Sequence, residues 1–112
     1  MRILDLSGGQ LPLLRAVRQT GTPMVVVLVN SKPLCIPWLA EHADAIVEAF
    51  NPGMAAGTAV AKILFGDENP CGKLTVSFAK SLGQQPVHCD QLPGWHGSRH
   101  GHYDARPLYA FG

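Results

Sequence analysis

Carboxylates are the side chains in this sequence best suited to bond-breaking chemistry. Asp44 and Glu48 lie four residues apart in the segment DAIVEAF. On a strand they would share a face but lie about 13 Å apart, whereas two carboxyl groups that attack and protonate one bond lie about 5 Å apart. A helix would bring them closer on a solvated face. Of the others, Asp67 and Glu68 suit a turn, and Asp5 and Asp90 have no obvious partner. We therefore predict no catalytic residue here.

Polar residues and glycine follow two apolar segments of the chain. Asn30 and Ser31 come after MVVVLV, and Asn51, Pro52 and Gly53 come after DAIVEAF. In open α/β sheets, ligands gather at the carboxyl ends of strands and at the helix starts that follow. Asn30, Ser31, Asn51 and Gly53 are therefore weak candidates for substrate binding. The same residues also suit chain reversal alone, and both interpretations stay open.

Histidine and cysteine are grouped near the end of the chain, at His88, Cys89, His96, His100 and His102. On an extended segment, His100 and His102 would point to one side, as metal ligands can. The spacing is loose and no supporting carboxylate pair is evident, so irregular surface histidines are the simpler interpretation. We predict no metal and no cofactor, with His96, His100 and His102 as the alternative metal ligands.

Composition limits the classes of partner. The 112 residues allow one domain, and 46% are apolar whereas only 15% are charged, against roughly 25% charged in typical domains. Much apolar surface must therefore find cover, for example on a missing partner. The net charge of +1 gives no field for nucleic acid or an anionic membrane, and residues 24–29 are too few to cross a bilayer. Three cysteines without CxxC spacing indicate free, mostly buried thiols. No leader pattern is visible, and the compartment stays open.

The elements that must position these residues alternate between helix and strand. Helical periodicity and end signals predict helices over residues 10–20, 33–42 and 54–65. The second helix should start near Ile36, since Pro37 suits a first turn, and Gly66 should end the third. Residues 24–29, 44–50 and 73–78 are predicted strands. The first lacks alternation, as a strand covered on both faces would, and the third alternates.

This order predicts an α/β fold: a layered sandwich fragment with about three mostly parallel strands flanked by helices. Residues 1–80 would form the core and residues 81–112 an irregular tail, within one partial domain covering residues 1–112. Three strands are few for a parallel sheet, so we expect one edge of the sheet to need further strands as neighbours. We therefore predict low stability or a homo-oligomer formed through the exposed sheet edge.

A longer ordered series of motifs resembles one known family. LDLSGGQLPLLRAV is similar to a Leu-x-Leu-Pro-Gly-x-Gln helix start, LFGDENPCGKL follows a Pro-Gly turn and helix, and PLYAFG closes the chain. Together they resemble the C-terminal α/β sandwich domain of glycoside hydrolase family 3, the β-glucosidase and β-xylosidase type. The likeness weakens between residues 84 and 106. The departures from the family pattern are Phe50 for Trp, Met54-Ala55-Ala56 for a more polar turn, Cys71 for Ser, and Thr75 and Ala110 for Pro.

The resemblance implies that the catalytic groups lie outside this chain. In that family the attacking Asp belongs to a separate N-terminal barrel, and the acid/base Glu, where it lies in the α/β domain, sits shortly before the Leu-x-Leu-Pro-Gly-x-Gln motif. Both positions are expected to be absent here. The chain would then support the active-site cleft of a β-glucosidase-like enzyme, with the missing barrel as partner and a β-glycoside bound only by the whole enzyme. The alternative is a free-standing α/β module that binds a small molecule or a metal.

Overall fold

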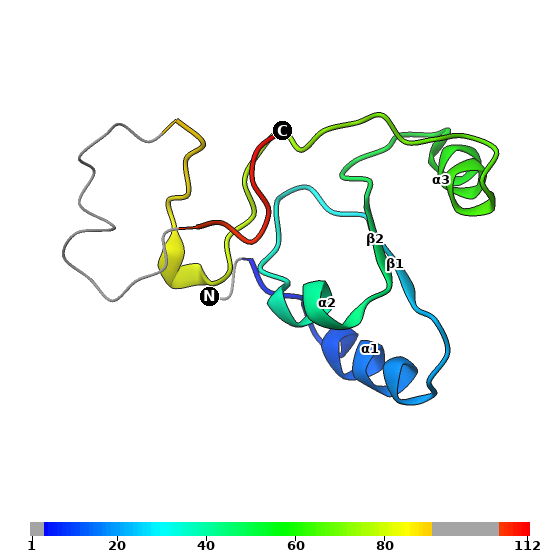
Figure 1. Ribbon diagram of the computed structural model, residues 1–112, viewed down its shortest axis with the longest axis horizontal. Helices are drawn as coiled ribbons and strands as arrows, with labels where there is room; N and C mark the ends of the chain where they lie inside the picture. Colours follow the sequence, from blue (N-terminus) through cyan, green and yellow to red (C-terminus); the bar gives the residue numbers. More distant parts are fainter. Residues whose placement is uncertain (1–3, 91–105) are drawn as a thin grey trace.

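The computed structural model describes residues 4–90 and 106–112 and shows a mixed α/β arrangement (Figure 1). Its elements, in chain order, are α1 (Gln10–Gln19), β1 (Val25–Leu28), α2 (Pro37–His42), β2 (Ala45–Glu48), α3 (Ala56–Phe65) and the 3-10 turn η1 (Leu82–Gln84). Pro37 occupies the first turn of α2, and Gly66 ends α3 in a left-handed conformation with φ 84°. The three predicted helices and the first two predicted strands are confirmed, with shorter bounds.

Parallel pairing of β1 with β2 holds the fold together. Val25 is opposite Ala45, and the register runs to Leu28 opposite Glu48. Leu28 accepts a hydrogen bond from Ala49 N at 2.9 Å. Because α2 connects the two strands, they form a β–α–β unit, as the order of elements predicts.

The predicted third strand at residues 73–78 is wrong. Among the described residues the sheet has two strands, and Phe78 instead forms one antiparallel bridge with Tyr109. Phe78 N donates to Tyr109 O at 2.8 Å, and Leu108 N donates to Phe78 O at 2.7 Å. The alternation of KLTVSF did indicate the less exposed face, since Leu74, Val76 and Phe78 are half-buried or buried whereas Lys73 and Thr75 are exposed; it fails at Ser77, which is buried as well. It could not indicate the partner, because the pairing residue comes from the end of the chain.

The tail is therefore only partly irregular. Leu82–Gln84 forms a 3-10 turn. Gly112 N donates to Leu74 O at 2.9 Å, and Phe111 N donates to Ser77 Oγ at 3.2 Å. The last residues thus run alongside the segment that follows α3.

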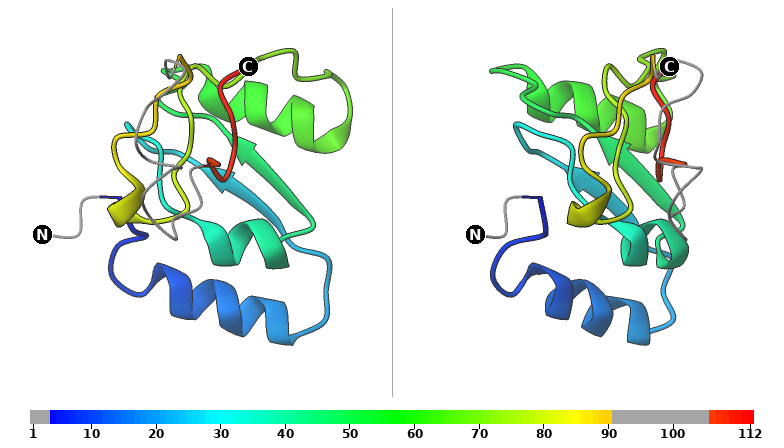
Figure 2. Two further views of the ribbon diagram at one scale, coloured as in Figure 1. Left: turned by 60° about the vertical axis from the view of Figure 1, so that its left-hand side comes forward. Right: turned by 90° about the vertical axis from the view of Figure 1, so that its left-hand side faces the viewer.

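The helices lie on both sides of the two-stranded sheet. α1 and α2 are neighbours on one side, and α3 lies on the other (Figures 1 and 2). Arg15 of α1 sits over the ring of Trp38 in α2 at 5.6 Å, and that ring stacks on His42 at 4.4 Å. A cation over an aromatic face is attractive, so this contact helps to hold α1 against α2.

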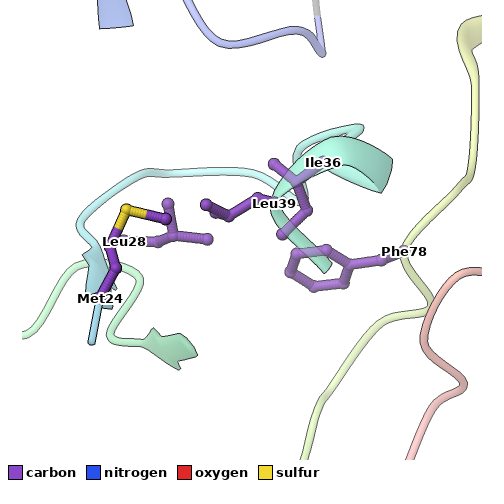
Figure 3. Packing of buried hydrophobic residues seen from close by; sticks show 5 residues of the cluster. All are labelled: Met24, Leu28, Ile36, Leu39 and Phe78. Carbon is purple, nitrogen blue, oxygen red and sulfur yellow. The ribbon is translucent and has the colours of Figure 1, made fainter. Parts of the chain in front are cut away.

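The buried core lies between β1, α2 and the segment that carries Phe78. Its members are Met24, Leu28, Ile36, Leu39 and Phe78. Figure 3 shows the side chains of Leu28 and Leu39 directed toward each other, with the Phe78 ring below Ile36. Met24 and Leu28 are both even-numbered, so they share the strand face that meets α2.

The predicted burial of the first strand on both faces is wrong. Val25 is 51% exposed and the adjoining Val29 is 67% exposed. These odd-numbered residues face away from the core, and only Val27 between them is partly covered. The uncovered apolar surface continues on two helices, since α1 and α3 have no buried residue and Phe65 is 85% exposed.

Candidate functional site

The four predicted binding residues lie where the two strands end. Asn30 and Ser31 follow β1, and Asn51 and Gly53 follow β2. Asn30 is half-buried, whereas the other three are exposed. Gly53 has φ 73°, a conformation that suits glycine, and its carbonyl accepts from Ala56 N at 3.3 Å at the start of α3. The strand pairing therefore brings both loops together at the carboxyl ends of the two strands. Their role in binding stays a prediction.

A hydrogen-bond cluster around Glu48 joins these two loops. Asn30 Nδ2 donates to Glu48 Oε2 at 3.3 Å, and Phe50 N donates to Glu48 Oε1 at 2.9 Å. Asn30 N also donates to Phe50 O at 3.1 Å. We name Asn30, Glu48 and Phe50 the strand-end cluster. The sequence indicated Asn30 but not the role of Glu48, because that role depends on the strand pairing, in which Glu48 is opposite Leu28 and reaches Asn30 in the loop beyond it.

Asp44 lies at the opposite end of β2. Its Oδ2 accepts from Met24 N at 2.7 Å and from Arg18 Nη1 at 3.1 Å. Asp44 thus joins the beginnings of both strands to α1, as Glu48 joins their ends. The two carboxylates have different partners at different ends of one strand, as the sequence analysis expected of a strand. This arrangement does not suit joint action on one bond.

A groove of about 540 Å³ lies beside β1. Consecutive residues from Val26 to Asn30, in β1 and directly after it, line this groove together with Leu13 and Leu14 of α1. Neighbouring residues of a strand point to opposite faces, so a groove that all of them line must follow the edge of the strand. The open edge of β1 agrees with the prediction that one edge of the sheet is left without a neighbouring strand.

The cysteines and histidines give no metal site in the part of the chain that the structure describes. No group of three or more His, Cys, Asp or Glu side chains is close enough there to hold a metal ion. His96, His100 and His102 lie outside the described residues. All three thiols are free, as predicted, but only Cys35 is buried, whereas Cys71 and Cys89 are exposed. No helix within residues 4–90 and 106–112 is long and apolar enough to span a membrane.

Comparison with known proteins identifies the family. Residues 2–112 match the glycosyl hydrolase family 3 C-terminal domain. A β-xylosidase of Formosa agariphila is 47% identical over 112 residues, which cover 97% of this chain and 16% of that protein. A periplasmic β-glucosidase of Salmonella typhimurium is 41% identical, with the same coverage. A β-glucosidase of Rhizobium radiobacter is 34% identical over 97% of this chain and 15% of its own length.

The chain therefore belongs to the glycosyl hydrolase family 3 C-terminal domain family. It spans only about 16% of the length of the first two relatives. The family resemblance seen in the motifs is confirmed, and most of each relative has no counterpart in these 112 residues.

The buried thiol of Cys35 gives a pH-dependent prediction. Burial raises its pKa above the ordinary value of 9.0, and the negative charge of Asp5 raises it further. The folded chain thus holds this proton more tightly than the unfolded chain, so its stabilising contribution is full below pH 9.0 and is lost as pH rises through the raised pKa. We expect the free energy of unfolding, measured by urea titration, to fall more steeply above about pH 9 in the wild type than in Cys35→Ala.

Cys71→Ala is the matched control, because Cys71 is exposed. Its stability should follow the wild-type pH dependence. Parallel declines in the wild type and Cys35→Ala would contradict the assignment.

Proposed function

We propose that the chain is part of a family 3 glycosidase that hydrolyses β-glucosides or β-xylosides, and that it supports the active-site cleft without being catalytic alone. The observation that carries this proposal is the match of nearly the whole chain to a C-terminal domain found in relatives named β-xylosidase and β-glucosidase. The names differ among relatives of similar coverage, so the proposal extends to both sugar classes.

The distribution of carboxylates supports a role outside the chemical step. Cleavage with retention needs an attacking carboxylate and an acid/base group about 5 to 5.5 Å apart. Asp44 is engaged by Arg18 and Met24 N, and Glu48 by Asn30 and Phe50 N, at separate ends of β2. The reacting carboxyl groups would come from the remainder of a longer enzyme, including its N-terminal barrel.

The loops at the strand ends are the part of this chain that would border the sugar. Asn30, Ser31, Asn51 and Gly53 offer amide, hydroxyl and backbone groups at one edge of the sheet. Such groups bind sugar hydroxyls by hydrogen bonds at the carboxyl ends of strands. We propose these four residues as contacts that assist binding.

An assay of the isolated chain and of a chimera tests this function. The pure chain should hydrolyse aryl β-glucosides and aryl β-xylosides no faster than buffer, because it would lack the catalytic pair. In the chimera, this chain replaces the matching segment of the Formosa agariphila β-xylosidase. We expect kcat/KM within about 100-fold of the parent, since a misplacement of about 1 Å costs that much.

The parent enzyme with the segment deleted is the control, and it should be inactive. Turnover by the pure chain would contradict the non-catalytic role. A folded but inactive chimera would contradict the supporting role.

The open edge of β1 also makes self-association the expected behaviour of the isolated chain. Edge strands with unpaired backbone groups and apolar side chains pair with other strands, and Val25 and Val29 are exposed there. Sedimentation equilibrium should show concentration-dependent dimers. Val29→Lys should weaken them, because an edge lysine opposes strand pairing. A compact monomer at every concentration would contradict this proposal.

A further inference from the structure

Phe50 has an unusual backbone conformation for an aromatic residue. Its φ is +50°, and it is the one described non-glycine residue with positive φ. Contact between Cβ and the backbone disfavours this region for L-residues, and bulky ones rarely enter it. The Phe50 ring nevertheless packs against the core, edge-on to Phe78 with ring centroids 6.3 Å apart. Something in the structure must therefore hold the backbone at this point.

Hydrogen bonds to both backbone groups of Phe50 provide that hold. Its N–H donates to Glu48 Oε1 at 2.9 Å, and its carbonyl accepts from Asn30 N at 3.1 Å. The Asn30 side chain closes the ring of contacts through its 3.3 Å bond to Glu48 Oε2. With the Asn30 amide rotated by 180°, its nitrogen donates instead to Glu48 Oε1 at 3.2 Å and also to Lys32 O at 3.0 Å, so Asn30 contacts Glu48 in either orientation.

Glu48 is the member of the strand-end cluster that contacts both loops. Glu48 is half-buried, and it takes part in neither of the ion pairs seen between described residues, which join Arg18 to Asp44 and Lys62 to Glu68. The charge is instead directed at N–H donors from the loop after β1 and the loop after β2. Hydrogen bonds to an ionised acceptor are stronger than neutral ones, so one side chain fixes the two loops relative to each other.

We propose that Glu48 is a positioning residue that holds Phe50 in its left-handed conformation and thereby fixes the direction of residues 51–53 at the sugar-facing edge. The functional part of this inference rests on the proposed function. Strained backbone persists where surrounding contacts over-determine it, and such positions cluster at ligand sites. Glu48 would not touch the sugar; it would keep Asn51 and Gly53 in place to do so.

Nuclear magnetic resonance on the isolated chain tests the positioning. Positive φ brings the amide and α protons of one residue close together, so wild-type Phe50 should show a strong intraresidue NOE between them. Glu48→Met keeps the length of the side chain but removes both acceptors, and this NOE should weaken to the level of ordinary strand residues. Glu48→Gln keeps a carbonyl acceptor for Phe50 N–H and should retain it.

Glu41→Ala is the control, since Glu41 is an exposed carboxylate on α2, and it should leave the Phe50 signal unchanged. If a variant fails to fold, a second measurement on the wild-type chain still tests the proposal. Scalar coupling across the hydrogen bond from Phe50 N to the Glu48 carboxyl carbon should be detectable. Its absence, or an unchanged NOE in folded Glu48→Met, would overturn the positioning role.

The chimera described above tests the functional consequence. There Glu48→Met should raise KM about tenfold, the size of one hydrogen bond to a charged group, with kcat nearly unchanged because the reacting groups lie elsewhere. Glu48→Gln should restore KM. Unchanged KM despite a lost Phe50 NOE would overturn the link to the sugar. An inactive wild-type chimera would contradict the proposed function, and the spectra would still decide the positioning.

Discussion

Parallel pairing of β1 with β2 is the interaction on which the rest of this structure depends. Its four-residue register brings together segments about twenty residues apart, and α2 packs on the face that the pairing creates. Side-chain carboxylates reinforce both ends. Asp44 binds Met24 N where the strands begin, and Glu48 binds Asn30 and Phe50 N where they end. The same pairing that builds the core therefore sets the geometry of the loops proposed to border a sugar.

The part of the chain that the structure describes forms two strands, which are too few to complete an α/β sandwich, and apolar surface is left exposed. A groove runs along the edge of β1, the odd-numbered valines at positions 25 and 29 are exposed, and α3 carries an exposed Phe65. Burial of apolar area is the main favourable term in folding, so these surfaces gain stability when covered. The relatives extend far beyond the matched segment, and we propose that the remainder of a longer enzyme covers these surfaces.

The sequence predicts well those features that local chemistry controls. Pro37 marks the first turn of α2, Gly66 ends α3, and the Val-rich run forms β1. It predicts poorly those that depend on distant partners. Residues 73–78 alternate as a strand does, but their partner at Tyr109 comes from about thirty residues away, which periodicity cannot reveal. The two-sided burial expected of β1 fails for a similar reason, since the described residues supply cover for only one face. The candidate site follows the same division. Asn30 stands out in the sequence as a turn residue, whereas the hydrogen bonds from Asn30 and Phe50 N to Glu48 depend on the pairing of the two strands.

Residue-resolved hydrogen exchange of the dilute, monomeric chain tests the incomplete sheet most directly. Met24 O and Leu28 O accept hydrogen bonds from the β2 side, and Asn30 N donates one to it. The even-numbered backbone groups therefore face β2, and the alternation of a parallel pair turns those of Val25 and Val27 outward. An open edge predicts protected amides at Val26 and Leu28 and exchange at Val25 and Val27 that is at least about tenfold faster. Equal protection at all four valine and leucine positions would show that this edge is already covered, and would contradict the account of an unfinished α/β unit.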